Sequence, residues 1–128
     1  MVSDQPRRVL LIDDDAQLRQ LYPRFFAAPE YDTRVAADGG TALGIVAEWR
    51  PDVILLDLVM KIRGTAVVPV LRLHPNSRDA LFIAFSGAVT DADREQLRAA
   101  GFDDVIPKGQ EAGVVVERVR QLLEQRKR

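Results

Sequence analysis

The sequence predicts an α/β fold in which five parallel strands form one sheet covered by helices on both faces. Short runs that are apolar at every position alternate with longer segments of helical period, and this alternation repeats five times in 128 residues. Strands that are apolar on both faces are typical of parallel sheets buried between helices. We therefore expect five β-α units joined by right-handed crossovers.

The predicted strands are three strong apolar runs and two weaker ones. The strong runs are residues 9–12, 53–56 and 81–85, and the weaker ones are 33–36 and 104–106. All but the last of these runs are four or five residues long, which is a usual length for a strand, and the last is slightly shorter. The order along the chain places one strand before each predicted helix.

Each helix is predicted from its cap, its apolar spacing or its stop signal. Asp15 is a suitable N-cap for the first helix, which Pro23 should kink or end early. The second is expected from about residue 40 to 49 and the third from about 64 to 73. The fourth begins with the capping box of Thr90 and stops at Gly101. The last has an apolar stripe, which is Val115, Val116, Val119, Leu122 and Leu123.

The composition excludes several classes of function. The chain has no cysteine, so disulfides and thiolate metal sites are excluded, and its one histidine, His74, lies in a turn-like stretch. A formal net charge of −1 gives no field that favours nucleic acid or an anionic membrane. No apolar run approaches the roughly 18 residues that a membrane span needs. We expect one cytoplasmic domain, residues 1–128, with its core at about 8–125.

Acidic residues follow two of the strong runs. Asp13, Asp14 and Asp15 end the first, and Asp57 ends the third. If the strand order is 2-1-3-4-5, these two strands are neighbours, and ligands of open parallel sheets bind at the carboxyl ends of the strands. Carboxylates gathered there repel one another unless a cation neutralises them. Oxygen ligands beside open space suit Mg²⁺, which bridges readily to phosphate.

The other two strand ends supply a hydroxyl and an ammonium. Ser86 follows the fourth strand and Lys108 follows the fifth. A carboxylate, a divalent cation, a hydroxyl and a lysine around one cavity make a phosphoryl-transfer site, in which Asp57 attacks and the others stabilise charge on the equatorial oxygens. The product is an aspartyl phosphate.

These segments resemble, from about residue 8 to 125, the receiver domain of two-component response regulators. The matching pieces, in order and at the family's spacing, are Val-Leu-Leu-Ile-Asp-Asp-Asp (9–15), Ala-Asp-Gly (37–39), Pro-Asp-Val-Ile-Leu-Leu-Asp-Leu-Val-Met (51–60), Phe-Ser-Gly (85–87), Ala-Gly-Phe-Asp-Asp (100–104) and Ile-Pro-Lys (106–108). The resemblance implies the flavodoxin-like (βα)5 three-layer sandwich with strand order 2-1-3-4-5, as in chemotaxis regulators.

The resemblance also implies a role for each site residue. Asp57 is the phosphoacceptor, Ser86 the switch hydroxyl and Lys108 the cation that pairs with the phosphoryl group. Asp14 ligates Mg²⁺ directly, and Asp57 and the backbone carbonyl of Val59 are further ligands. Asp13 binds the ion through water or helps to position it.

The implied activity is signalling. The domain promotes only its own phosphorylation and dephosphorylation and is otherwise no enzyme. The phosphoryl donor is a sensor histidine kinase or a histidine phosphotransfer protein, and the output is a downstream effector protein or an output domain. Homodimerisation is left open, and no direct binding to nucleic acid or membrane is implied.

Four positions depart from the family's pattern. The loop after Met60 lacks the usual proline and is one residue shorter, and Gly109 stands where a proline usually follows the lysine. Val105 replaces the usual aromatic residue of the fifth strand, and Pro23 interrupts the first helix. We expect the chemistry to survive these changes and the transmission of the signal to differ.

Two other classes of function remain as alternatives. The first is a pseudo-receiver, a binding module that works without phosphorylation, which the altered loop and Val105 favour. The second is an enzyme, either a phosphatase with an aspartate nucleophile or a flavin-binding protein. A phosphatase of that kind has a second aspartate where this chain has Val59, and the acids after the first strand would repel a flavin phosphate.

Overall fold

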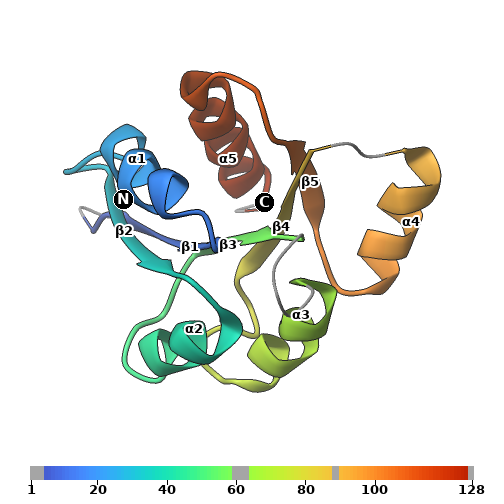
Figure 1. Cartoon of the computed structure of the whole chain (residues 1–128). Helices are drawn as coiled ribbons and strands as arrows, with labels where there is room; N and C mark the ends of the chain where they lie inside the picture. Colours follow the sequence, from blue (N-terminus) through green and yellow to red (C-terminus); the bar gives the residue numbers. More distant parts are fainter. Residues whose placement is uncertain (1–4, 59–63, 88–89, 127–128) are drawn as a thin grey trace.

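In a computed structural model of the chain, described for residues 5–58, 64–87 and 90–126, five strands and five helices alternate (Figure 1). The strands are β1 (Arg7–Ile12), β2 (Tyr31–Ala36), β3 (Val53–Asp57), β4 (Leu81–Ser86) and β5 (Asp104–Pro107). The helices are α1 (Ala16–Phe25), α2 (Gly39–Val46), α3 (Gly64–Leu73), α4 (Asp91–Ala99) and α5 (Ala112–Arg126).

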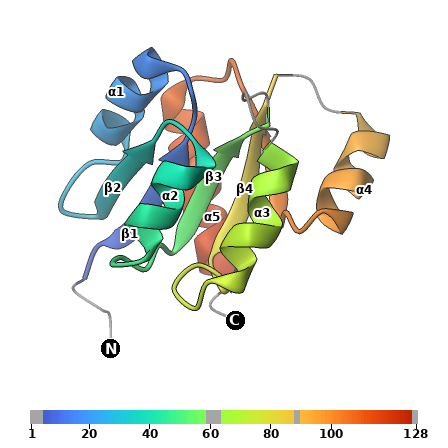
Figure 2. The same cartoon turned by 60° about the horizontal axis from the view of Figure 1, so that its bottom comes forward.

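The strands form one sheet in the order β2-β1-β3-β4-β5, and every neighbouring pair is parallel. This confirms the predicted fold and strand order. Helices α1 and α5 cover one face, while α2, α3 and α4 cover the other, so that the sheet is the middle layer of three (Figure 2). None of the described helices is long and apolar enough to cross a membrane.

The all-apolar strands are explained by two separate cores. Alternate residues of β1, β3 and β4 face opposite sides of the sheet, because successive side chains of a strand point in opposite directions. Leu10, Ile54 and Phe82 pack under α2 and α3, whereas Leu11 and Leu55 pack under α1 and α5. All five side chains are inaccessible to solvent. A strand buried on both faces must be apolar throughout.

Most of the predicted helix ends are confirmed. The Asp15 carboxylate caps α1 by accepting a hydrogen bond from Gln17 N at 2.9 Å. Thr90 and Asp93 form the reciprocal capping box of α4. Pro23 lies inside α1, which ends two residues later at Phe25. Gly101 follows the end of α4 with a φ of 108°, a conformation that glycine adopts without strain.

Helix α2 begins after its N-cap Asp38, whose carboxylate accepts a hydrogen bond from Thr41 N at 2.7 Å. The predicted end of this helix was wrong. It was expected at about residue 49, but the helix ends at Val46, where a tighter turn from Glu48 N to Ile45 O follows.

The indole ring of Trp49 is buried beside the sheet. It is 3% exposed, and the guanidinium groups of Arg34 and Arg8 lie 4.8 and 5.7 Å from its ring centre. Arg8 and Arg34 come from the neighbouring strands β1 and β2. Cations over the face of an indole are attracted by its electron density. The ring therefore joins the end of α2 to the start of the sheet.

Arg72 joins two loops at the end of the sheet where the strands begin. Its guanidinium donates to the carbonyl oxygens of Arg78, Ala80 and Gly101 at 2.7, 3.1 and 2.8 Å, and to the Asp103 carboxylate at 3.1 Å. The same carboxylate accepts a hydrogen bond from Phe82 N at 2.8 Å. One side chain of α3 thus fixes the entry to β4 and the turn before β5.

We expect Arg72→Met to lower the free energy of unfolding by about 2 kcal/mol or more, because charge-assisted hydrogen bonds are lost and carbonyl oxygens lose their donors. Urea unfolding followed by circular dichroism measures the change. Arg78→Met is the control, because the Arg78 side chain is 61% exposed. Its ion pair with Asp79, at 3.8 Å, is long and exposed to solvent and contributes little to stability. Equal effects of the two substitutions would contradict the role given to Arg72.

Candidate functional site: an acidic cluster at the carboxyl end of the sheet

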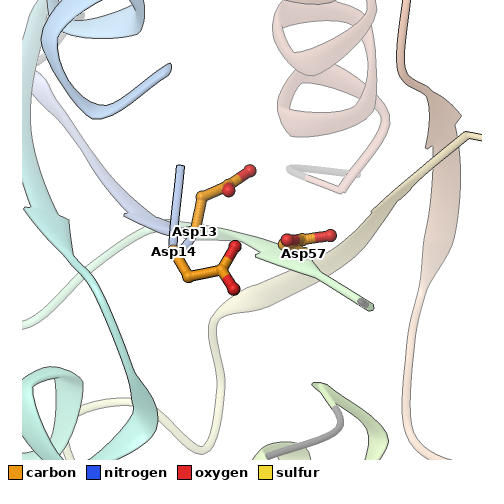
Figure 3. Close-up of side chains that lie close together, drawn as sticks. All are labelled: Asp13, Asp14 and Asp57. Atoms are coloured by element: carbon orange, nitrogen blue, oxygen red, sulfur yellow. The ribbon is translucent and has the colours of Figure 1, made fainter. Parts of the chain in front are cut away.

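Three carboxylates meet at the edge of the sheet where β1 and β3 end. Asp13 and Asp14 follow β1 directly, and Asp57 is the last residue of β3. One oxygen from each lies within 4.8 Å of the others (Figure 3). The two strands are neighbours, and Leu56 is in register with Ile12, so their ends stand side by side. The strand order alone therefore brings these acids together.

Asp13 is buried completely, and its two oxygens have different surroundings. Oδ1 accepts a hydrogen bond from Asp15 N at 2.9 Å. Oδ2 has no hydrogen-bond partner in the described part of the chain, although Lys108 Nζ lies 3.2 Å away as an ion pair. Burial raises the pKa of the Asp13 carboxyl, and the negative charge of Asp57 raises it further. The hydrogen bond from Asp15 N and the positive charge of Lys108 lower the pKa but do not cancel this rise.

The Lys108 ammonium lies between two carboxylates. Its Nζ is 3.1 Å from Asp57 Oδ1 and 3.2 Å from Asp13 Oδ2. Burial works to lower the pKa of this ammonium, but the nearby Asp57 and Asp13 carboxylates outweigh it, and the net pKa is raised. Lys108 therefore carries its charge at neutral pH and offsets the repulsion between the two buried acids.

The loop after β5 places Lys108 without a cis peptide bond. Lys108 N donates to the Ser86 carbonyl at 2.6 Å, which joins the end of β5 to the end of β4. Gly109 follows with a φ of 90°, a left-handed conformation that favours glycine. Within the described residues the one cis bond is Ala28–Pro29, so the bond between Lys108 and Gly109 is trans.

Ser86 ends β4 and is 8% exposed. Its neighbour Phe85 is in register with Asp57 across β3 and β4, and it packs under α1 and α5. Ser86 follows Phe85 and therefore points to the opposite face of the sheet. Val105 lies on that face, in the core under α2, α3 and α4.

The donor set fits a hard divalent cation such as Mg²⁺. The cluster offers carboxylate oxygens only, and Mg²⁺ prefers oxygen ligands from one or two carboxylates together with waters and phosphate. Asp13 Oδ2 is a buried oxygen with no hydrogen bond in the described part of the chain, and coordination would satisfy it. Asp14 is exposed and leaves the cluster open to solvent.

The structure thus brings together the side chains of four of the six predicted site residues, which are Asp13, Asp14, Asp57 and Lys108. The fifth, Ser86, is joined to Lys108 through its backbone carbonyl. Val59, predicted to ligate Mg²⁺ through its carbonyl, lies outside the described residues, as does the shortened loop after Met60. Sequence reasoning missed Phe85, whose ring lies next to the Lys108 ammonium. Its place as the last residue of the apolar run 81–85 gave no signal of this.

The family model of the response regulator receiver domain matches residues 9–120, and the chain therefore belongs to that family. As a receiver domain it is a signalling domain of two-component systems.

Relatives of known name agree with this assignment. The regulatory protein AtoC of Escherichia coli is 31% identical over 123 residues, which are 94% of this chain and 26% of AtoC. The DNA-binding response regulator MtrA of Mycobacterium leprae is 36% identical over 115 residues, which are 89% of this chain and 50% of MtrA. The chain thus spans between a quarter and half the length of these relatives.

Solved structures share the fold. The chemotaxis response regulator CheY4 of Vibrio cholerae superposes with a TM-score of 0.83 at 21% identity, over 91% of this chain and 98% of that one. A putative response regulator from Chloroflexus aurantiacus gives a TM-score of 0.80 at 24% identity, over 93% and 98%.

In the absence of divalent cations, Asp13→Asn should stabilise the fold at neutral pH. The pKa of Asp13 is raised above its ordinary value of 3.8 in the folded state. Such a group contributes stability below its unfolded pKa and loses it as the pH rises through the folded pKa. The asparagine removes the buried charge, so the gain should appear at neutral pH and vanish in acid.

Urea unfolding in chelator at both pH values measures this difference. Asp14→Asn is the control, because the Asp14 side chain is exposed and pays little for its charge. A loss of stability in Asp13→Asn at neutral pH would contradict the prediction.

Proposed function

We propose that this receiver accepts a phosphoryl group on Asp57 in a Mg²⁺-dependent reaction and thereby switches its interactions with other proteins. The observation that carries the proposal is the Lys108 ammonium held between the Asp57 and Asp13 carboxylates at 3.1 and 3.2 Å. A buried acid beside a fixed cation and two further acids has the parts that phosphoryl transfer needs.

In the proposed reaction a carboxylate oxygen of Asp57 attacks the phosphorus of a phosphohistidine. The new bond is an O–P bond to Asp57, and the P–N bond to the donor's imidazole breaks, so the imidazole nitrogen takes the electron pair. Asp57 needs no general base, because a carboxylate is already a nucleophile. Its position at the end of β3, 2% exposed, limits attack to the open side beside Asp14.

Asp13, Asp14 and Asp57 would hold the Mg²⁺, together with the carbonyl of Val59, which lies outside the described residues. When bound, the metal supplies positive charge for the equatorial oxygens of the phosphoryl group. Lys108 would pair with one of these oxygens, and the Ser86 hydroxyl would turn to donate to another. Both would stabilise charge that grows as the transfer proceeds.

The proposed partners follow from the family. The donor is a sensor histidine kinase or a histidine phosphotransfer protein, and the output is an effector protein or an attached domain. We further propose that residues 1–128 form one receiver domain that acts in the cytoplasm. Val105 in β5 has no ring to couple to Ser86, so the switch should work with a smaller motion there or through another face.

Incubation with acetyl phosphate and Mg²⁺ should add the mass of one phosphoryl group to the protein. Intact-mass spectrometry measures the gain, and peptide mapping after borohydride trapping locates it. Asp57→Asn or an excess of chelator should abolish it, because the nucleophile or the metal is then missing. Asp52→Asn is the matched control, since Asp52 precedes the same strand at its far end. A wild-type protein that never gains the mass would favour the pseudo-receiver.

Mg²⁺ alone should stabilise the fold. A ligand that binds only the native state at about 100 times its dissociation constant adds about 2.7 kcal/mol to the free energy of unfolding. Thermal unfolding with and without Mg²⁺ measures this, with Ca²⁺ and Na⁺ salts at equal ionic strength as comparison. Asp13→Asn should lose most of the gain. Equal stabilisation of wild type and Asp13→Asn would contradict a metal site at these carboxylates.

A further inference from the structure

The Phe85 ring lies next to the Lys108 ammonium of the proposed site. Lys108 Nζ sits over this ring, 5.5 Å from its centre. Phe85 is 1% exposed, and its backbone is in register with Asp57 on the neighbouring strand. Side chains in register on neighbouring strands point to the same face, so Asp57 and Phe85 stand beside each other under α1. Lys108 touches both.

Tyr22 of α1 supports this ring. The rings of Tyr22 and Phe85 meet edge to face, with centres 5.5 Å apart and an interplanar angle of 84°. Tyr22 is 5% exposed, and the Asp13 and Lys108 charges act on its phenol. A ring fixed by a second ring and by the core has few alternative orientations. Phe85 therefore presents a fixed face to the ammonium.

The ring differs from the two carboxylates in one physical respect. Asp13 and Asp57 are the acids that a divalent cation would neutralise, and a neutralised carboxylate attracts Lys108 less. An aromatic face attracts an ammonium without taking part in metal binding, and the attraction grows when the pair is shielded from water. The Lys108 side chain is 28% exposed, so part of this shielding is in place.

We propose that Phe85, held by Tyr22, is a positioning residue that keeps the Lys108 ammonium directed into the phosphoryl pocket. The inference rests on the proposed function, because Phe85 affects the rate of phosphorylation only if Lys108 takes part in that reaction. It assigns an aromatic partner on the face of the sheet under α1 and α5, opposite to Val105.

Phe85→Leu tests the proposal, because it keeps an apolar side chain and removes the ring. The rate constant for phosphorylation by acetyl phosphate at saturating donor should fall about three- to tenfold, the size of a partly shielded cation–π contact. The donor concentration for half-maximal rate and the Mg²⁺ affinity from calorimetry should stay unchanged, since Lys108 acts on charge that develops during transfer. All variants are assayed well below their unfolding temperatures.

Phe82→Leu is the matched control. Phe82 lies on the same strand, is completely buried, and has the Arg72 guanidinium 4.0 Å from its ring centre, but it packs on the opposite face. Phe82→Leu should lower the free energy of unfolding about as much as Phe85→Leu, because both truncate a buried ring. It should leave the phosphorylation rate within about twofold of wild type, because Phe82 lies on the opposite face from Lys108. Equal rates in Phe85→Leu and Phe82→Leu would overturn the proposal.

A second measurement is independent of phosphorylation. The chain has three lysines, so a protein labelled with ¹³C at lysine gives few Cε methylene signals. The signal that disappears in Lys108→Arg is that of Lys108. In the metal-free protein its protons should be shifted upfield by the ring and should lose that shift, and gain mobility, in Phe85→Leu alone. An unchanged Lys108 signal would overturn the proposal. A wild-type protein that shows the signal but gains no phosphoryl group would contradict the proposed function and leave the placing of Lys108 supported.

Discussion

The site depends on the ion pairs of Lys108 with Asp13 and Asp57. Two buried carboxylates within reach of one another are unfavourable in a low-dielectric interior, and the single ammonium of Lys108 offsets the charge of both. The rest of the structure supplies the geometry for it. The hydrogen bond from Lys108 N to the Ser86 carbonyl fixes where the side chain begins, and Gly109 lets the chain turn away at once. The pairing sets one ammonium against both acids and leaves the side toward Asp14 open to solvent.

A parallel sheet is well suited to holding charges that repel one another. The backbone hydrogen bonds of the strands and the apolar cores on both faces contribute the stability, so the carboxyl ends of the strands can carry groups that contribute none. The opposite edge is built differently. There Arg72 binds carbonyl oxygens and the Asp103 carboxylate. One edge is stabilised by complementary pairs, and the other retains an excess of acid that a ligand can use.

Much of the fold and most of the site could be predicted, because both follow from local patterns. Runs apolar at every position define buried parallel strands, and acids after two such runs define the pocket once the strand order is known. What could not be predicted depends on contacts between distant residues or on a choice between equivalent local structures. Asp38 before two glycines suits a turn as well as an N-cap, and only the packing of α2 decides. The place of Phe85 beside Lys108 requires the register of three strands, which no single segment specifies.

The single tryptophan of the chain has a consequence for spectroscopy. Trp49 lies just before β3 and touches Arg8 and Arg34, so it belongs to the end of the sheet where the strands begin, whereas the carboxylates lie where they finish. Its emission should therefore respond to the opening of the core and to the two arginines, and hardly at all to events in the pocket. Tyr22, next to Phe85 and under the influence of Asp13, is the intrinsic chromophore closer to the chemistry. Red-edge excitation selects Trp49, so its emission reports global unfolding, whereas Tyr22 shares its absorption band with Tyr31.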